Sequence, residues 1–237
     1  MRAPAQAFRF DKPVPYPPAA KAMDRLVEAR LQGLIPDTLL FLEHEPVITF
    51  GSRGRNQFLL KPAEELEREG VQLVQSTRGG DITYHGPGQL VVYPILALKG
   101  AEADSHRYMH NLEEAAIRTC SDYSLQAFRV PGKTGAWTDQ GKIAAMGVRL
   151  RRWITSHGMS FNVSVDLGYT AWIVPCGLAG QRVTSLKERL AETCPSVPAV
   201  RERLNMHLAE TLDRETAWSD GPLPEALRDL APYRTAP

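Results

Sequence analysis

Hydrophobic residues recur along the chain with spacings that predict its helices. In residues 19–33 and 105–123 they lie three to four positions apart, as expected for helices with one buried face. In the second of these the face comprises Tyr108, Leu112, Ala115, Ala116 and either Thr119 or Cys120. A further helix is predicted at 197–212, and shorter ones at 61–70 and at 185–192, where Ser185 and Glu188 have the spacing of a capping box.

Short apolar runs bounded by turn-forming residues predict strands. They occupy residues 37–51, as two runs broken at Glu45 and Pro46, then 71–76, 90–98 and 142–165, the last as two strands joined near Arg151 and Arg152. Several strands follow one another without an intervening helix. This pattern favours an α+β fold over a doubly wound parallel sheet.

The two ends of the chain lack such a pattern. Residues 1–18 are rich in proline and are expected to be extended or poorly ordered, and residues from Ala217 onward return to turns and proline. The sequence contains neither an internal repeat nor a low-complexity linker. One domain over residues 1–237 is therefore expected.

Composition narrows the class of protein. The chain has 237 residues, of which 43% are hydrophobic and 23% charged, and its net charge is +1. These values are ordinary for a globular protein and do not point to nucleic acid or a membrane surface as partner. The basic run 149–153 fits either a solvated turn or a partner site. With no apolar run of signal-peptide or membrane-spanning length, a cytoplasmic location is expected.

Three stretches could carry chemistry besides the cysteines. Residues 78–89 hold four glycines, an arginine and a histidine, which suit either tight turns or a backbone that approaches a ligand, although the spacing is not that of a phosphate loop. Lys142 begins the apolar run 141–148, where a lysine usually reaches to solvent. Gly158, beside His157, indicates a bulge or a close backbone approach.

The chain has three cysteines, without a C-x-x-C pair, so neither a disulfide framework nor a zinc site is expected. Cys120 falls in a helical apolar pattern and Cys194 precedes a proline in a loop. Cys176 alone, in "IVPCGLAG", is flanked by turn-forming residues that could present it at the end of an apolar segment. Its local sequence leaves open whether it packs or reacts.

Taken together and in order, residues 36–54, 78–98, 141–150, 156–163 and 173–186 resemble the lipoyl(octanoyl) transferases, also called the lipoate–protein ligase B family. The resemblance implies a mixed β-sheet flanked by helices, as in the catalytic domains of biotin and lipoate ligases. It implies transfer of an octanoyl group from octanoyl-acyl carrier protein, through a cysteine thioester, to a lysine of apo lipoyl domains. The acceptors would be 2-oxoacid dehydrogenase complexes and the glycine cleavage H protein, and no metal or other cofactor is expected.

The resemblance also assigns residues. The family's catalytic cysteine falls on Cys176 and its lysine on Lys142, while its substrate contacts fall on Arg78, Gly79, Gly80, Asp81, Ile82, Thr83, Tyr84, His85, Ala145, Met146, Gly147, Gly158, Met159 and Ser160. A lysine ammonium could lower the pKa of a nearby thiol or exchange a proton with it, and the sequence leaves the resting state open. His85 and His157 are rival bases.

Two other functions fit parts of the sequence. An ATP-dependent lipoate or biotin ligase would use a related fold but needs no nucleophilic thiol. A noncatalytic acyl-carrier-binding protein would leave Cys176 merely buried. The cysteine and lysine motifs occur together with the glycine-rich segment, which favours the transferase.

Overall fold

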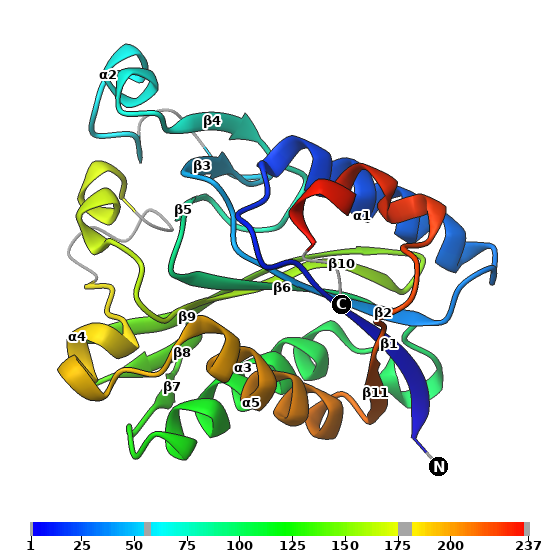
Figure 1. Cartoon of the computed structure of the whole chain (residues 1–237). Coiled ribbons are helices and arrows are strands. Elements are labelled where there is room, and N and C mark those ends of the chain that lie inside the picture. Colours follow the sequence, from blue (N-terminus) through cyan, green and yellow to red (C-terminus); the bar gives the residue numbers. More distant parts are fainter. Residues whose placement is uncertain (1, 55–57, 175–181, 235–237) are drawn as a thin grey trace.

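The computed structural model describes residues 2–54, 58–174 and 182–234 and is built around a mixed eight-stranded sheet (Figure 1). Its strand order is β11-β1-β2-β6-β10-β9-β8-β7. These strands are β1 (Ala3–Arg9), β2 (Asp37–Leu42), β6 (Gln89–Ile95), β7 (Phe128–Val130), β8 (Lys133–Thr138), β9 (Gly141–Arg151), β10 (Ile154–Asn162) and β11 (Arg214–Trp218). Only β1 pairs in parallel, with β2 and β11, and the other neighbours are antiparallel.

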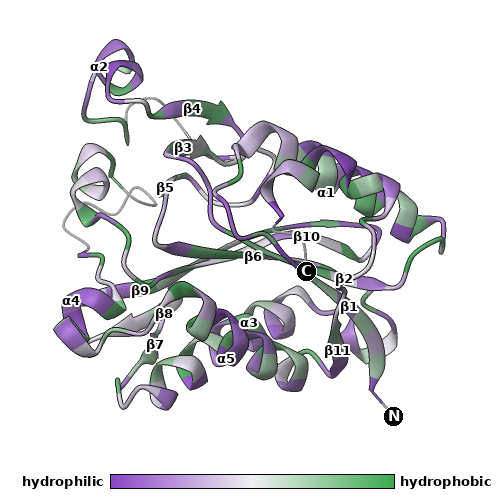
Figure 2. Cartoon of the chain, viewed as in Figure 1, coloured by the Kyte–Doolittle hydropathy of each residue, from purple (hydrophilic) through white to green (hydrophobic). Residues whose placement is uncertain are grey.

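Helices cover both faces of this sheet. On one face lie α3 (Ser105–Asp122) and α5 (Val197–Thr211), and on the other α1 (Tyr16–Leu31) and the 3-10 segment η6 (Glu225–Tyr233), as Figure 1 shows. Each layer buries its own apolar cluster against the strands. The peripheral helices α2 (Ala63–Arg68) and α4 (Leu186–Leu190) are mainly hydrophilic in Figure 2. The arrangement confirms the expected α+β class.

A second, three-stranded sheet positions the site. It comprises β4 (Gln72–Gln75), β3 (Val47–Phe50) and β5 (Ile82–His85) in the order β4-β3-β5, and β5 leads through residues 86–88 directly into β6 of the large sheet. It has a small apolar core of its own, which includes Ile48, Leu66 and Tyr84. The glycine-rich segment therefore runs between the two sheets.

The periodic patterns predicted most elements. The helices expected at 19–33, 61–70, 105–123, 185–192 and 197–212 are α1, α2, α3, α4 and α5. Ser185 Oγ accepts a hydrogen bond from the Glu188 backbone N–H (3.1 Å), as a capping box requires. The Glu188 carboxylate instead accepts from Thr184 Oγ1 (2.6 Å) and Arg182 (2.8 Å), so only half of the box forms.

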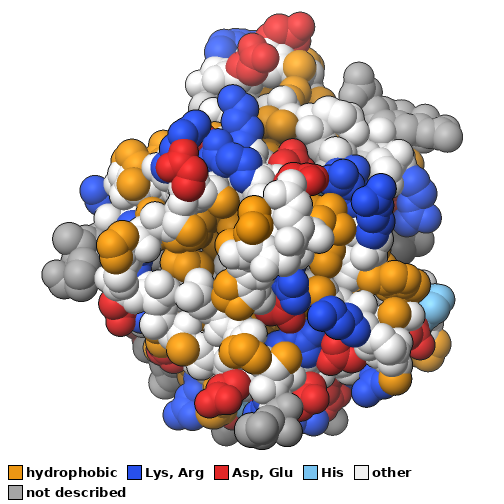
Figure 3. Space-filling view, turned by 90° about the vertical axis from the view of Figure 1, so that its right-hand side faces the viewer, with side chains coloured by type: hydrophobic (Ala, Val, Ile, Leu, Met, Phe, Trp, Pro, Cys, Tyr) orange, Lys and Arg blue, Asp and Glu red, His pale blue; other side chains and the backbone are white. Residues whose placement is uncertain are grey.

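The basic run 149–153 contains the turn of a hairpin. Arg152 and Trp153 both have positive φ, the conformation of a type I′ turn, and they connect β9 to β10. On the face shown in Figure 3, basic and acidic side chains are interspersed with hydrophobic ones. The turn at Arg152 and Trp153 confirms the predicted connection between the two strands near Arg151 and Arg152.

None of the described helices has the length and hydropathy to cross a membrane.

Both ends of the chain differ from expectation. Residues 1–18 were expected to be extended or poorly ordered; β1 within them is an extended strand paired in the large sheet, with Ala7 and Phe8 buried, and α1 already begins at Tyr16. The tail forms β11 and η6 rather than turns alone. The reason in each case is a distant partner: β1 pairs with β2 and β11, and η6 buries Leu227 and Leu230 in the same core cluster as α1.

Candidate active site

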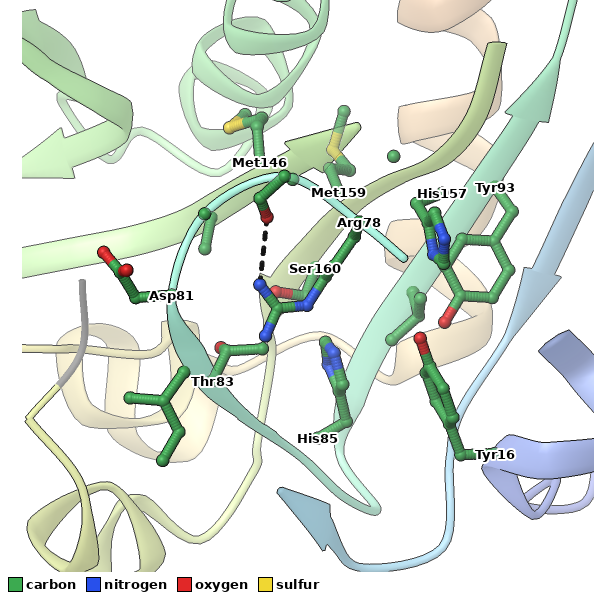
Figure 4. A pocket seen from close by; sticks show the side chains of 17 residues that line it. Tyr16, Arg78, Asp81, Thr83, His85, Tyr93, Met146, His157, Met159 and Ser160 are labelled. Carbon is green, nitrogen blue, oxygen red and sulfur yellow. Dashed lines mark hydrogen bonds between the residues drawn. The ribbon is translucent and has the colours of Figure 1, made fainter. Parts of the chain in front are cut away.

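A pocket of about 520 Å³, including its open mouth, lies between the glycine-rich segment and the central strands. Its lining comes from the glycine-rich segment, β6, β9, β10 and α1, and Figure 4 labels ten of the side chains. The lining comprises Arg78, Gly79, Gly80, Asp81, Ile82, Thr83 and His85 from the segment, Ala145, Met146 and Gly147 from β9, and His157, Gly158, Met159 and Ser160 from β10, together with Val91, Tyr93 and Tyr16. Thirteen of the fourteen substrate contacts predicted from the sequence therefore surround one cavity.

Arg78 fixes the glycine-rich segment against β3. Its guanidinium donates to the Thr49 carbonyl (2.6 Å) and to Thr49 Oγ1 (3.1 Å from Nε), and also to the Gly79 carbonyl, the bond drawn in Figure 4. The Gly79 N–H donates to the Val148 carbonyl (3.0 Å), so the segment also touches β9. A Cβ on Gly147 would lie 3.1 Å from the Gly79 carbonyl, so a larger residue there would push the two backbones apart by a few tenths of an ångström.

The apolar wall follows from the register of β9 and β10. Gly147 faces Gly158, Met146 faces Met159 and Ala145 faces Ser160 in three consecutive antiparallel pairs. Two segments that are separate in the sequence therefore form one continuous surface. Gly158 also lets β10 approach β6, because a Cβ there would lie 2.2 Å from the Val92 carbonyl.

Buried polar rings form the opposite side of the pocket. The His85 and Tyr16 rings are stacked at 6.4 Å, and His44 lies 5.6 Å from His85. Hydrogen bonds join His44 Nε2 to Tyr93 OH (2.6 Å), Tyr16 OH to Ser76 Oγ (2.7 Å) and His85 Nδ1 to Gln89 Oε1 (2.6 Å). This side of the pocket therefore combines aromatic surface with fixed polar atoms.

Burial keeps these histidines neutral. It lowers the pKa of His44 to about 4 and that of His157 to about 3, and it holds the pKa of His85 well below its usual 6.5, with His44 adding to the effect. Desolvation disfavours the charged imidazolium, and no carboxylate is among the groups that shift these values. At neutral pH these three imidazole rings are thus uncharged, and the positive charge of the pocket lining is that of Arg78.

Lys142 is the second residue of β9 and does not line this pocket. Its backbone N–H donates to the Arg182 carbonyl (2.9 Å) and its carbonyl accepts from the Thr184 N–H (3.0 Å). Its Nζ lies 4.8 Å from the centre of the Trp137 ring. A Cβ on Gly135 would lie 3.2 Å from the Lys142 Cε, so the glycine leaves room for the stem. Cys176 lies outside the described residues.

Tyr84 is the one predicted substrate contact that lies elsewhere. Its ring stacks on Tyr169 (4.7 Å) within the core of the small sheet. Three lining residues, Tyr16, Val91 and Tyr93, were not anticipated, and His157 was considered only as a base. Val91 and Tyr93 are two positions apart in a strand, which places them on the same face of that strand. The sequence alone did not show that this face borders the pocket.

The fold and the pocket define the class of protein. Residues 15–209 match the lipoyl protein ligase A/B catalytic domain. A solved lipoate-protein ligase A bound with ATP superimposes with a TM-score of 0.73 at 18% identity, over 98% of this chain and 93% of that one. The biotin protein ligase of Aquifex aeolicus gives a TM-score of 0.50 at 11% identity, over 87% and 68%. At these identities the two structures establish the fold alone.

Sequence similarity is more specific. An octanoyltransferase of Solibacter usitatus (strain Ellin6076) is 46% identical over 202 residues, which is 85% of this chain and 90% of that protein. The chain belongs to the octanoyltransferase family. The resemblance inferred from the short motifs is thereby confirmed.

Proposed function

We propose that this protein moves an octanoyl group from octanoyl-acyl carrier protein to the acceptor lysine of apo lipoyl domains, through a thioester on Cys176. The acceptors would be the lipoyl domains of 2-oxoacid dehydrogenase complexes and the glycine cleavage H protein. The observation that carries the proposal is the convergence of Arg78–His85, β9 and β10 on one pocket, in a chain 46% identical to an octanoyltransferase. We also propose that residues 1–237 act as a single catalytic domain.

The pocket suits an acyl chain with a polar end. Met146, Met159, Val91 and Ala145 provide apolar surface, and methionine adapts its shape to a flexible chain. Arg78 and its hydrogen bonds hold the segment that closes the pocket. The predicted contacts along residues 78–85 would therefore bind the octanoyl group mainly through backbone and apolar atoms.

Two balanced steps complete the transfer. The Cys176 thiolate attacks the thioester carbon; the new C–S bond forms as the carrier's C–S bond breaks, and Lys142 gives its proton to the departing thiol. The acceptor amine then attacks the acyl-enzyme; a C–N bond forms, the C–S bond to Cys176 breaks, and Lys142 takes the proton released by the amine. Thioester exchange is nearly balanced in energy and amide formation is downhill, so ATP has no role.

The surroundings of Lys142 support its part in this scheme. The Trp137 ring, 4.8 Å from Nζ, gives the Lys142 ammonium a cation–π contact. An ammonium beside a thiol stabilises the thiolate and lowers the pKa of that thiol. The backbone of Lys142 pairs with residues 182–184, which follow Cys176 by six to eight positions in the sequence.

The test uses purified protein, octanoyl-acyl carrier protein and an apo lipoyl domain, with intact-mass measurement of all three. ATP-independent transfer with an octanoyl adduct on the enzyme supports the proposal. Modification that requires free octanoate and ATP would point to the ligase instead. Binding of the carrier without any transfer would point to a noncatalytic protein.

A further inference from the structure

A buried chain of hydrogen bonds runs from the pocket to the strand segment that pairs with Lys142. His85 Nδ1 meets Gln89 Oε1 (2.6 Å), Gln89 Nε2 meets Asn162 Oδ1 (2.9 Å), and Asn162 Nδ2 meets the Thr184 carbonyl (3.0 Å). It crosses from β6 to β10 and on to residue 184. All four side chains are at least nine-tenths buried. Only His85 among them lines the pocket.

The far end of this chain determines the direction of every bond. The Thr184 carbonyl can only accept, so Asn162 presents Nδ2 to it and has Oδ1 left for Gln89. Gln89 must then present Nε2 to Asn162, and the same nitrogen lies 3.3 Å from the Tyr84 carbonyl, another pure acceptor. Turning over either amide would set two acceptors or two donors against each other.

The tautomer of His85 follows. Gln89 Oε1 can only accept, so His85 Nδ1 carries the hydrogen, and in a neutral ring Nε2 then bears a lone pair. Free neutral histidine in water prefers the opposite tautomer, with the hydrogen on Nε2. Within the described part of the chain no hydrogen bond involves Nε2 of His85, while the ring itself lines the cavity.

We propose that Gln89 and Asn162 are positioning residues that hold His85 as the Nδ1–H tautomer, so that its Nε2 accepts a hydrogen bond from the attacking amine of the acceptor lysine. This deepens the proposed octanoyl transfer and rests on it. The octanoyl group offers only a carbonyl oxygen, which a lone pair repels, whereas the amine offers N–H groups. Accepting one of them turns the nitrogen lone pair toward the thioester. No proton is transferred to His85.

This chain of hydrogen bonds from His85 through Gln89 and Asn162 to Thr184, called the relay below, ends beside Lys142. The Thr184 N–H donates to the Lys142 carbonyl (3.0 Å), so Asn162 and Lys142 bind the two sides of one residue's backbone. A group that orients the amine and a group that takes its proton are thus tied to one segment. This arrangement predicts that breaking the relay slows transfer to the lipoyl domain and spares formation of the acyl-enzyme.

The first measurement is the tautomer itself, by nitrogen-15 NMR of the whole protein at neutral pH, with the His85 signals assigned by their loss in His85→Gln. We expect the Nδ1–H form in the wild type and the Nε2–H form in Gln89→Met, which removes the acceptor at similar size. An Nε2–H wild type would overturn the proposal without bearing on octanoyl transfer. Because the deciding tautomer is read from the wild type, poor folding of Gln89→Met cannot hide the result.

The second measurement separates the two chemical steps. In Gln89→Met we expect acyl-enzyme formation within about twofold of wild type and transfer to the lipoyl domain slowed about tenfold, the usual worth of one hydrogen bond. Asn162→Leu, which can neither accept from Gln89 nor donate to Thr184, should show a weaker split in the same direction, because the Tyr84 carbonyl still holds Gln89 Nε2. The control is Asp122→Asn, which alters the hydrogen bond of another largely buried histidine, His207, between α3 and α5. Equal slowing of both steps, or unchanged transfer with the Nε2–H tautomer, would refute the positioning role.

Discussion

At the scale of single residues, the two described thiols, Cys120 and Cys194, lie in surroundings that disfavour a thiolate. Burial raises the pKa of Cys120 to about 12 and also raises that of Cys194, so neither forms a thiolate readily at neutral pH. We predict that Cys176→Ser lowers transfer by about three orders of magnitude or more, as the loss of a nucleophile does in other enzymes. Intact-mass measurement after incubation with octanoyl-acyl carrier protein checks this, and an undiminished adduct would contradict it.

The matched control for that variant is Cys194→Ser. Its Sγ lies 3.7 Å from the Val163 carbonyl, a contact that a hydroxyl can also make. Acyl-enzyme formation and transfer should both stay close to wild type. A serious loss in this variant would show that the activity depends on more than one thiol.

The positive charge of Lys142 and its ability to exchange a proton can be tested separately. Lys142→Arg keeps a charge that can hold a thiolate but cannot act as a base, whereas Lys142→Ala keeps neither property. We predict that the arginine variant still reacts with iodoacetamide at neutral pH yet stalls in transfer to the lipoyl lysine. The pH dependence of alkylation at Cys176, recorded beside transfer, is the measurement. Profiles identical to wild type in Lys142→Ala would remove the lysine from the mechanism and leave His85 as the leading base.

At the scale of elements, the close approach of the glycine-rich segment to β9 shapes the pocket. Gly80 has φ +84°, a conformation that strains any L-residue, but a Cβ there would meet only Arg78 Nη1 at 3.6 Å. We predict that Gly80→Ala costs about 1–2 kcal/mol of stability from backbone strain. It should also raise the KM for octanoyl-acyl carrier protein, because the segment must shift where it lines the cavity.

Gly33 provides the control for this strain. It has φ +73° at the end of α1, with nothing within 4 Å of a Cβ, and it does not line the pocket. Gly33→Ala should therefore lose similar stability and keep the parental KM. Thermal melting and transfer kinetics of both variants would separate strain from substrate binding. If the two variants had the same kinetics, the segment would have no part in binding.

At the scale of the whole molecule, the buried histidines make stability depend on pH. Burial lowers the pKa of His44 to about 4 and of His157 to about 3, and that of His85 lies well below 6.5. These groups are neutral in the folded protein and take up a proton near pH 6.5 when it unfolds. Their contribution is therefore fully present above about pH 6.5 and is lost as the pH falls from there toward the folded-state values.

We predict that each of these histidines costs about 1 kcal/mol of unfolding free energy between about pH 7.5 and about pH 5.5. Urea denaturation at the two values measures the fall. His157→Asn should make the fall in unfolding free energy smaller by about 1 kcal/mol, because one titrating ring is removed. Asparagine is chosen because it tolerates the positive φ of that position. His106 is exposed on α3, and His106→Gln should leave the fall unchanged. Equal stability at both pH values would contradict the neutral state of the buried rings.

The sequence by itself determined the elements whose signal is local. The apolar period of residues 105–122 and the Ser185 cap of α4 require only neighbouring residues, because helix hydrogen bonds and caps join positions a few apart. The motifs were local too, and they identified the family and thirteen of the residues that line the pocket. Lys142 and Cys176 were assigned by the same resemblance, and the variants described above test them.

Only the tertiary structure decided what depends on distant partners. β1 is a strand because β2 and β11 supply its hydrogen bonds, and nothing in a proline-rich start reveals them. The alternation of a strand puts Val91 and Tyr93 on the same face of β6, but only the folded structure shows that this face lines the pocket. Gln89 and Asn162 are 73 positions apart, so the relay that sets the His85 tautomer exists only once β6 and β10 have paired. Hydrogen-bond direction is a property of the assembled chain of donors and acceptors, and no single residue carries it.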